Sequence, residues 1–224
     1  MGASADCMGG VFAKAPRAGY VKTRLIPLRG PDGACVLHAR LLAHALRTVS
    51  AAAIGPLELW CLPTITDPAL QQAAALEGAS LLDQGDGSLG KRMQRAFAST
   101  LLREPRCILL GADCPSLTVQ DLRMAAAALD KYDAVLTPAE DGGYVLIGLQ
   151  RGPQLALARL FDGIAWSTET VLQATRERFR ELQLRWHELP TRWDVDRPED
   201  YHRLVREMPA LANRAASPDR PGRW

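Results

Sequence analysis

The chain has 224 residues, of which 47% are hydrophobic and 23% are charged, and its formal net charge at pH 7 is +2. These values are typical of one soluble globular domain, and they argue against a general nucleic-acid binder, which needs many phosphate contacts over a basic face. Five cysteines without a C-x-x-C motif indicate reduced thiols in a cytoplasmic protein, and no apolar run is long enough to span a membrane. A small molecule is therefore the expected partner.

Apolar runs of strand length alternate with longer segments of helical period, which is the rhythm of an α/β protein. The expected strands cover 10–13, 57–62, 79–82, 107–110 and 133–137, and a strand-like stretch covers 184–195. The run 107–110 is uninterrupted, as in a central strand that is buried on both faces.

Capping residues and apolar spacing mark the helices. One helix is expected from Asp32 to about 53, and the next begins at Pro68 after the N-cap Asp67 and ends at Gly78. Further helices are expected through Met93 to Leu101, over 119–129 with Thr118 and Asp121 as a capping box, after Ser167 or Thr168, and after Asp196 with Glu199 at the third helical position. A single domain over 1–213 follows, with a disordered Pro-rich tail over 214–224.

The first loop concentrates positive charge. Between Asp6 and Asp32 the chain has no acid but carries five cations, Lys14, Arg17, Lys22, Arg24 and Arg29. Gly19 lets the backbone approach a phosphate, although the pattern matches neither common glycine-rich phosphate loop. The loop therefore suggests a polyphosphate ligand, and a solvated basic loop is the alternative.

Two aspartates later in the chain are candidate metal ligands. Asp113 stands at the carboxyl end of the apolar run 107–110, where ligands of open α/β sheets bind, and it could hold a divalent metal against phosphate oxygens or cap a turn before Pro115. Asp196, in the run Trp193–Tyr201, could be the second metal ligand or a helix cap. The run Asp141–Tyr144 could be a hairpin turn or a glycine floor for a substrate. Cys114 has no base at a recognisable spacing, so a covalent intermediate is not expected.

Four motifs are distinctive in combination: Phe12–Leu25, Gly111–Pro115, Asp141–Tyr144 and Asp194–Asp200. Together they resemble a family of uncharacterised bacterial transferases of the nucleotide-diphospho-sugar transferase superfamily, labelled glycosyltransferase A-like and associated with radical-SAM and selenium-domain proteins. The runs 22–25 and 141–143 also look like those of phospholactate guanylyltransferases. The resemblance extends to about Tyr201 and implies a GT-A fold: a mostly parallel sheet with helices on both faces and a nucleotide site with Mg²⁺ or Mn²⁺.

The resemblance also implies roles for individual residues. The nucleotide would be bound by Lys14, Arg17, Gly19, Lys22, Thr23, Arg24, Gln84 and Gly90, with Lys22, Arg24 and Asp113 catalytic. The metal would be held by Asp113 and Asp196, and the acceptor by Asp141, Gly142, Gly143 and Tyr144. The first loop lacks the Gly-Gly pair and the nearby Arg of sugar-nucleotide pyrophosphorylases, so only the phosphate and metal roles transfer directly.

Three functions stay open at this point. Nucleotidyl transfer from a nucleoside triphosphate to a small phosphorylated acceptor is favoured, because the leaving pyrophosphate needs several cations. Glycosyl transfer from a nucleotide sugar to an acceptor needs fewer cations, and a nucleotide-binding protein without turnover has less need of two metal carboxylates. The sequence predicts no nucleic-acid or membrane partner and leaves a homodimer open.

Overall fold

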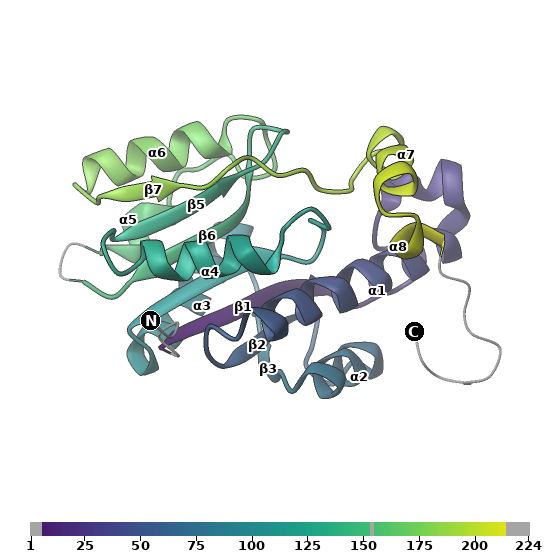
Figure 1. The fold of residues 1–224 in the computed structure, drawn as a ribbon, viewed down its shortest axis with the longest axis horizontal. Coiled ribbons are helices and arrows are strands. Elements are labelled where there is room, and N and C mark those ends of the chain that lie inside the picture. The colour runs from purple at the N-terminus through teal and green to yellow at the C-terminus, as the bar shows by residue number, and fades with distance from the viewer. Residues whose placement is uncertain (1–5, 153–154, 214–224) are drawn as a thin grey trace.

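The computed structural model describes residues 6–152 and 155–213, and its centre is one sheet of seven strands in the order β3-β2-β1-β4-β6-β5-β7 (Figure 1). The strands are β1 (Cys7–Lys14), β2 (Leu57–Leu62), β3 (Ser80–Asp83), β4 (Arg106–Gly111), β5 (Ala134–Pro138), β6 (Tyr144–Gln150) and β7 (Trp186–Glu188). Strand β6 is antiparallel to both neighbours, and the other pairs are parallel. The mostly parallel sheet and the central position of the run 107–110 are thus confirmed.

Helices cover both faces of the sheet. They are η1 (Thr23–Leu25), α1 (Ile26–Ala52), α2 (Pro68–Glu77), α3 (Leu89–Arg103), α4 (Val119–Ala128), α5 (Leu157–Phe161), α6 (Val171–Glu181), α7 (Pro198–Glu207) and α8 (Pro209–Asn213). One hydrophobic cluster joins α1, α2 and α4 to the sheet, and a second joins α3, α5 and α6 to it. A third cluster packs α7 and α8 against the first part of α1, at one end of the molecule (Figure 1). Among the described residues, no helix has the length and apolarity needed to cross a membrane.

Local signals fixed the limits of two helices as predicted. The side chain of Asp67 accepts a hydrogen bond from the backbone of Ala69, and Gly78 ends α2 in the left-handed conformation, with φ of 68°. Thr118 and Asp121 form both bonds of the predicted capping box at the start of α4. These ends depend only on neighbouring residues, which is why the sequence predicts them well.

Long-range packing changed two other elements. Helix α1 begins at Ile26 rather than Asp32, because a first turn is joined to the main helix through a kink at Gly30, with φ of 68°. Of the stretch 184–195, only the three residues of β7 are a strand. The chain then crosses to α7 as an extended segment over 189–197, here called the strap (Figure 1).

Two predicted helix caps are wrong. The N-cap of α6 is Thr170, whose side chain makes no capping bond to the helix, whereas the Thr168 hydroxyl donates to the carbonyl of Ala165. The N-cap of α7 is Arg197 and the third helical position is Asp200, whose carboxylate accepts from the backbone N–H groups of Asp196 and Arg197. The side chain of Asp196 therefore does not cap the helix.

Candidate active site

A cleft of about 560 Å³ opens at the carboxyl ends of β1 and β4, which is a usual size for a small-molecule site. Its polar lining comes from the end of β1 and the first loop, from α1, from the loops after β3 and β4, from the start of α3, from the β5–β6 hairpin, from the loop before α6 and from the strap. These residues are Lys14, Lys22, Arg24, His38, Gln84, Arg92, Asp113, Asp141, Tyr144, Ser167, Thr168, Asp194 and Asp196. Segments distant in sequence thus converge where an α/β sheet ordinarily binds its ligand.

Asp113 and Lys22 form an ion pair in this cleft. Lys22 Nζ lies 2.9 Å from Asp113 Oδ1 and donates to the carbonyl of Val195 at 2.5 Å. The Lys22 side chain is 4% exposed, whereas that of Asp113 is 43% exposed. The backbone of Lys22 is left-handed, with φ of 48°, a conformation that costs a non-glycine residue free energy and that is common at functional sites. The fold therefore holds this ammonium group in place at some cost.

His38 completes the surroundings of Asp113. Its Nε2 donates to the carbonyl of Lys14 at 2.9 Å, and its Nδ1 lies 3.7 Å from Asp113 Oδ1. Burial alone would raise the pKa of Asp113, but Lys22 and His38 together hold that pKa well below its usual value. Asp113 is consequently a carboxylate at every working pH. His38 was not predicted from the sequence, because a histidine on the apolar face of a helix usually belongs to the core.

Asp194 lies beside Asp113 and was also missed. The backbone N–H of Val195 donates to the Asp113 carbonyl at 2.9 Å, and Ser116 bonds the backbone of Trp193, so the strap is fixed against the loop after β4. Burial raises the pKa of Asp194 to about 6, with the charges of Asp141 and Asp113 acting in the same direction and Lys22 opposing them. The signal was available, because residues two apart on an extended segment share a face and Asp194 precedes Asp196 by two.

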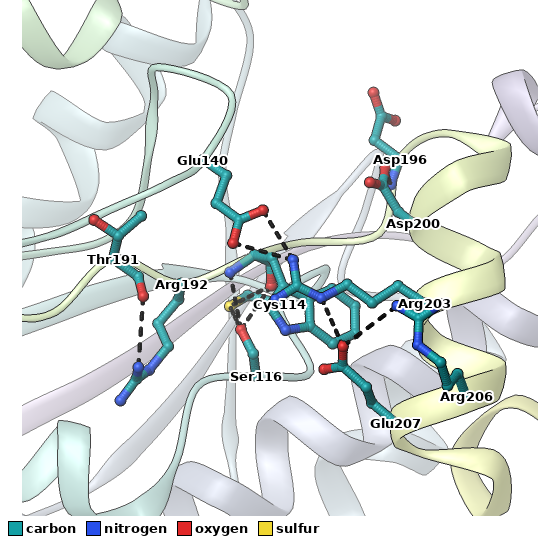
Figure 2. A network of polar contacts seen from close by, with 11 residues as sticks. Cys114, Ser116, Glu140, Thr191, Arg192, Asp196, Asp200, Arg203, Arg206 and Glu207 are labelled. Carbon is teal, nitrogen blue, oxygen red and sulfur yellow. Dashed lines mark hydrogen bonds and ion pairs between the residues drawn. The ribbon is translucent and has the colours of Figure 1, made fainter.

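Arg203 of α7 supports the strap and the hairpin from outside the cleft. Figure 2 shows its guanidinium group between Glu140 and Glu207, at 2.9 and 3.0 Å from their carboxylates. The same group stacks on Trp193, 4.5 Å from the ring centre. Glu140 precedes Asp141 and Trp193 precedes Asp194, so one side chain holds the two acidic segments together.

The donor groups at Asp113 fit a divalent cation that keeps part of its water shell. Asp113 and Asp194, which both line the cleft, offer two carboxylates. No cluster of three or more acidic, histidine or cysteine ligands converges within the described part of the chain. Two carboxylates with substrate phosphates as the other ligands suit Mg²⁺ or Mn²⁺.

The predicted nucleotide residues divide into two groups. Lys14, Lys22, Arg24 and Gln84 line the cleft, and Arg24 forms an ion pair with Asp196, which lines it as well. The other four do not line it: Arg17 pairs with Asp67 at 3.0 Å, Gly19 and Thr23 are exposed, and Gly90 is buried beneath Trp166. A charge run in the sequence cannot show which cations turn inward.

The structure shows a hairpin turn at Asp141–Gly143 and a buried Cys114. Strands β5 and β6 form a hairpin around Asp141–Gly143, and Asp141, Gly143 and Tyr144 also line the cleft. Gly142 instead packs tightly on the backbone of Glu169.

Cys114 is buried with its Sγ against the carbonyl of Trp193 at 3.2 Å, and burial raises the pKa of the thiol to about 11. It is therefore a protonated thiol, not a nucleophile.

Many solved structures are similar to this one, including the following three. A protein from Desulfovibrio desulfuricans G20, provisionally assigned as a nucleotide-diphospho-sugar transferase, is 29% identical with a TM-score of 0.79, over 93% of this chain and 97% of the other. Rv0371c of Mycobacterium tuberculosis H37Rv, complexed with manganese, is 20% identical with a TM-score of 0.55 over 91% and 100%. A cytidylyltransferase from Leptospira borgpetersenii is 13% identical with a TM-score of 0.58 over 95% and 98%.

The last two identities are low enough that they show the fold alone. No curated protein matches the sequence. Residues 45–168 match the family described as "Uncharacterized protein conserved in bacteria (DUF2064)", and this match covers more than half of the chain. The chain therefore belongs to the DUF2064 family and has the GT-A-like fold of nucleotidyl- and glycosyltransferases.

Proposed function

We propose that the protein is a metal-dependent nucleotidyltransferase, which transfers a nucleoside monophosphate from a nucleoside triphosphate to a small phosphorylated acceptor. The observation that carries the proposal is the pairing of Asp113 with Lys22 at the carboxyl end of β4, in a cleft that Lys14 and Arg24 also line. The structural neighbours are glycosyl- and nucleotidyltransferases, which supports an enzyme of the transferase class.

The acidic residues supply the cation site. Asp113 and Asp194 would hold Mg²⁺ or Mn²⁺, and the manganese complex of Rv0371c supports a divalent ion in this fold. Such an ion, when bound, neutralises charge on the phosphate oxygens. Asp196 stays the alternative second ligand, although its carboxylate is engaged by Arg24.

The cations act on the leaving group. An acceptor phosphate oxygen bonds to the α-phosphorus while the bond from that phosphorus to the bridging oxygen breaks, and pyrophosphate leaves. Lys14, Lys22 and Arg24 lie where they can bind its developing charge. No protein group needs to form a covalent bond in this direct transfer, which agrees with the protonated thiol of Cys114.

Glycosyl transfer is the second candidate. It is favoured by the 29% identity to a protein provisionally assigned as a nucleotide-diphospho-sugar transferase. In that reaction an acceptor hydroxyl attacks the sugar and a nucleoside diphosphate leaves, so the same cations would bind a different product.

The product distinguishes these reactions. The protein is incubated with Mg²⁺ or Mn²⁺, panels of nucleoside triphosphates and nucleotide sugars, and an extract of small metabolites. Release of pyrophosphate from a triphosphate is expected, whereas release of a nucleoside diphosphate from a nucleotide sugar would establish glycosyl transfer. Tight nucleotide binding with neither product would show a binding protein without turnover.

A further inference from the structure

The side-chain amide of Gln84 is fully hydrogen-bonded within the protein and positions Arg92. Its side chain is buried, and its Nε2 donates to the carbonyls of Ala13 and Trp60 at 3.1 and 2.8 Å. Its Oε1 accepts from Nη1 of Arg92 at 2.9 Å. Both amide protons are therefore in use, so a ligand cannot receive them without breaking bonds to the ends of β1 and β2. Through its Oε1, Gln84 holds the guanidinium group of Arg92, which lines the cleft.

Among the residues that the structure describes, Arg92 has no acidic partner. It lines the cleft from the first turns of α3, and its Nε is buried without a hydrogen-bond partner in the described structure. Behind it, Arg95 donates to the backbone carbonyls of Gln84 and Asp86. In the part of the chain that the structure describes, all these acceptors are neutral, and no carboxylate pairs with either arginine. Burial and the charge of Arg95 accordingly lower the pKa of Arg92.

Two neighbouring guanidinium groups without an acid are costly in a partly buried site, unless an anion arrives to offset their charge. Two other half-buried arginines have an acidic partner: Arg176 pairs with Glu188, and Arg192 pairs with Asp121. Arg92 lines the cleft without such a partner in the described structure, which indicates a site for an anion that the described residues do not provide.

The position of Arg92 separates this site from the metal carboxylates. Lys22 and His38 approach Asp113 from the side of α1, whereas α3 belongs to the hydrophobic cluster on the other face of the sheet. The cleft is also lined by Leu89, Met93, Tyr144 and Trp166, which belong to or pack against the hydrophobic cluster that contains α3. A ligand bound here would place an anionic group on Arg92 and an apolar or ring surface against these side chains.

We propose that Arg92, held by Gln84 and backed by Arg95, binds a carboxylate or phosphate group of the acceptor substrate. This inference rests on the proposed function, which places the nucleotide phosphates at Asp113 and Lys22. It defines the acceptor as a small anionic molecule, and it makes Arg92 the residue that selects for that charge. A planar guanidinium offers two parallel donors, so it suits either kind of oxyanion.

Inorganic phosphate is the probe. Its binding to the full chain is measured by calorimetry, in the free protein and in protein saturated with Mg²⁺ and the nucleoside triphosphate that binds best. We expect the nucleotide-loaded protein still to bind phosphate, and Arg92→Met to weaken that affinity about tenfold or more while nucleotide affinity stays within about twofold. Arg92→Lys, which keeps the charge but not the fork of donors, should fall between them.

Arg123 provides the control: within the described structure its guanidinium donates to the carbonyls of Ala51 and Ala52, and it lies on α4 outside the cleft lining, although it is more exposed than Arg92. Arg123→Met should leave phosphate affinity unchanged.

An unchanged phosphate affinity in folded Arg92→Met would overturn the site. Loss of phosphate binding once nucleotide is saturating would show that Arg92 holds a phosphate of the nucleotide, which overturns the acceptor assignment. Failure of every nucleotide to bind would instead overturn the proposed function, while phosphate binding by Arg92 could still be measured in the free protein.

Discussion

The two sides of the cleft handle charge in opposite ways. On the side of α1, Asp113 has the ammonium of Lys22 at 2.9 Å, and Asp196 has Arg24. On the side of α3, the acceptors that Arg92 and Arg95 have within the described ranges are all neutral. On the side of α1 the charged groups are already paired, so a metal and a nucleotide must replace existing ion pairs when they bind. On the side of α3 the positive charge is unpaired in the described part of the chain, so an anion can bind without displacing an acidic partner.

This difference shows how each side is to be tested. Where the charges are paired, removing one partner changes the protein as well as the ligand affinity, so a stability control is essential. Where they are unpaired, a neutral variant should lose ligand affinity and keep or gain stability. Five further substitutions probe the comparison on the side of Asp113.

Asp113→Asn should have the largest effect. If Asp113 holds the metal at the nucleotide phosphates, losing its charge removes several kcal/mol of transition-state stabilisation, and turnover should fall roughly a hundredfold or more. Asn keeps the size and an oxygen that can accept from Lys22, so the fold should hold. Turnover and nucleotide binding are measured against metal concentration, with thermal melting as the control. Wild-type activity and metal response in the variant would contradict the assignment.

Asp194→Asn tests the acid whose pKa is raised. Because the folded pKa of about 6 exceeds the ordinary value of about 3.9, the protonated form is favoured by folding, and its contribution to stability is lost as the pH rises from about 4 through 6. Above pH 6 the ionised group should cost the metal-free protein on the order of 2 kcal/mol. The variant should therefore unfold at higher urea concentration than wild type at pH 8, with little difference at pH 4.

The metal response checks the same residue independently. In wild type, Mn²⁺ should raise the urea midpoint at pH 8, because the cation binds the ionised carboxylate. In Asp194→Asn this increase should be smaller. A variant that is less stable than wild type at pH 8, yet responds fully to Mn²⁺, would show that Asp194 is structural.

Features that depend on neighbouring residues could be predicted from the sequence, whereas features that depend on residues far apart in the chain could not. The limits of α2 follow from Asp67, Pro68 and Gly78, which act on their immediate neighbours. The position of Asp113 follows from the apolar run before it. The environment of Asp113 does not, because His38 and Lys22 reach it through the packing of α1 and the strained turn before it.

The basic loop shows the same limit. Arg17 and Arg24 are equivalent in the sequence, yet Arg17 meets Asp67, 50 residues away, and Arg24 meets Asp196, 172 residues away. Only the fold decides which of them reaches the cleft. The pairing of Arg92 with Gln84 also depends on the ends of β1 and β2, which hold the amide in place.

Arg24→Ala and Arg17→Ala make a matched pair that measures this distinction. Arg24 lines the cleft, so its loss should weaken binding of the Mg²⁺–nucleotide complex about tenfold, the low end for a charge-assisted bond. Arg17→Ala removes the same charge from the same loop but outside the cleft, and should change affinity less than about twofold. Since the Arg24–Asp196 pair is exposed, its loss should cost at most about 1 kcal/mol of stability. Equal losses of affinity would indicate a diffuse charge effect, which added salt would abolish in both variants.

Cys114→Ser should have the smallest effect, and it tests whether the residue next to Asp113 takes part in the chemistry. The thiol is buried, its pKa is raised to about 11, and it contacts the carbonyl of Trp193. A serine hydroxyl can make the same contact, although the site was built for the larger sulfur, so a modest loss of stability is expected without a change in mechanism. Turnover should stay within about twofold of wild type, measured with the substrate pair that the product assay identifies. Mass spectrometry of the wild-type protein during turnover provides the second readout, because direct transfer predicts an unmodified chain. Loss of turnover in folded Cys114→Ser, together with a nucleotide-sized adduct on wild type, would instead require a thiolate, and burial and the carboxylate of Asp194 both oppose its formation.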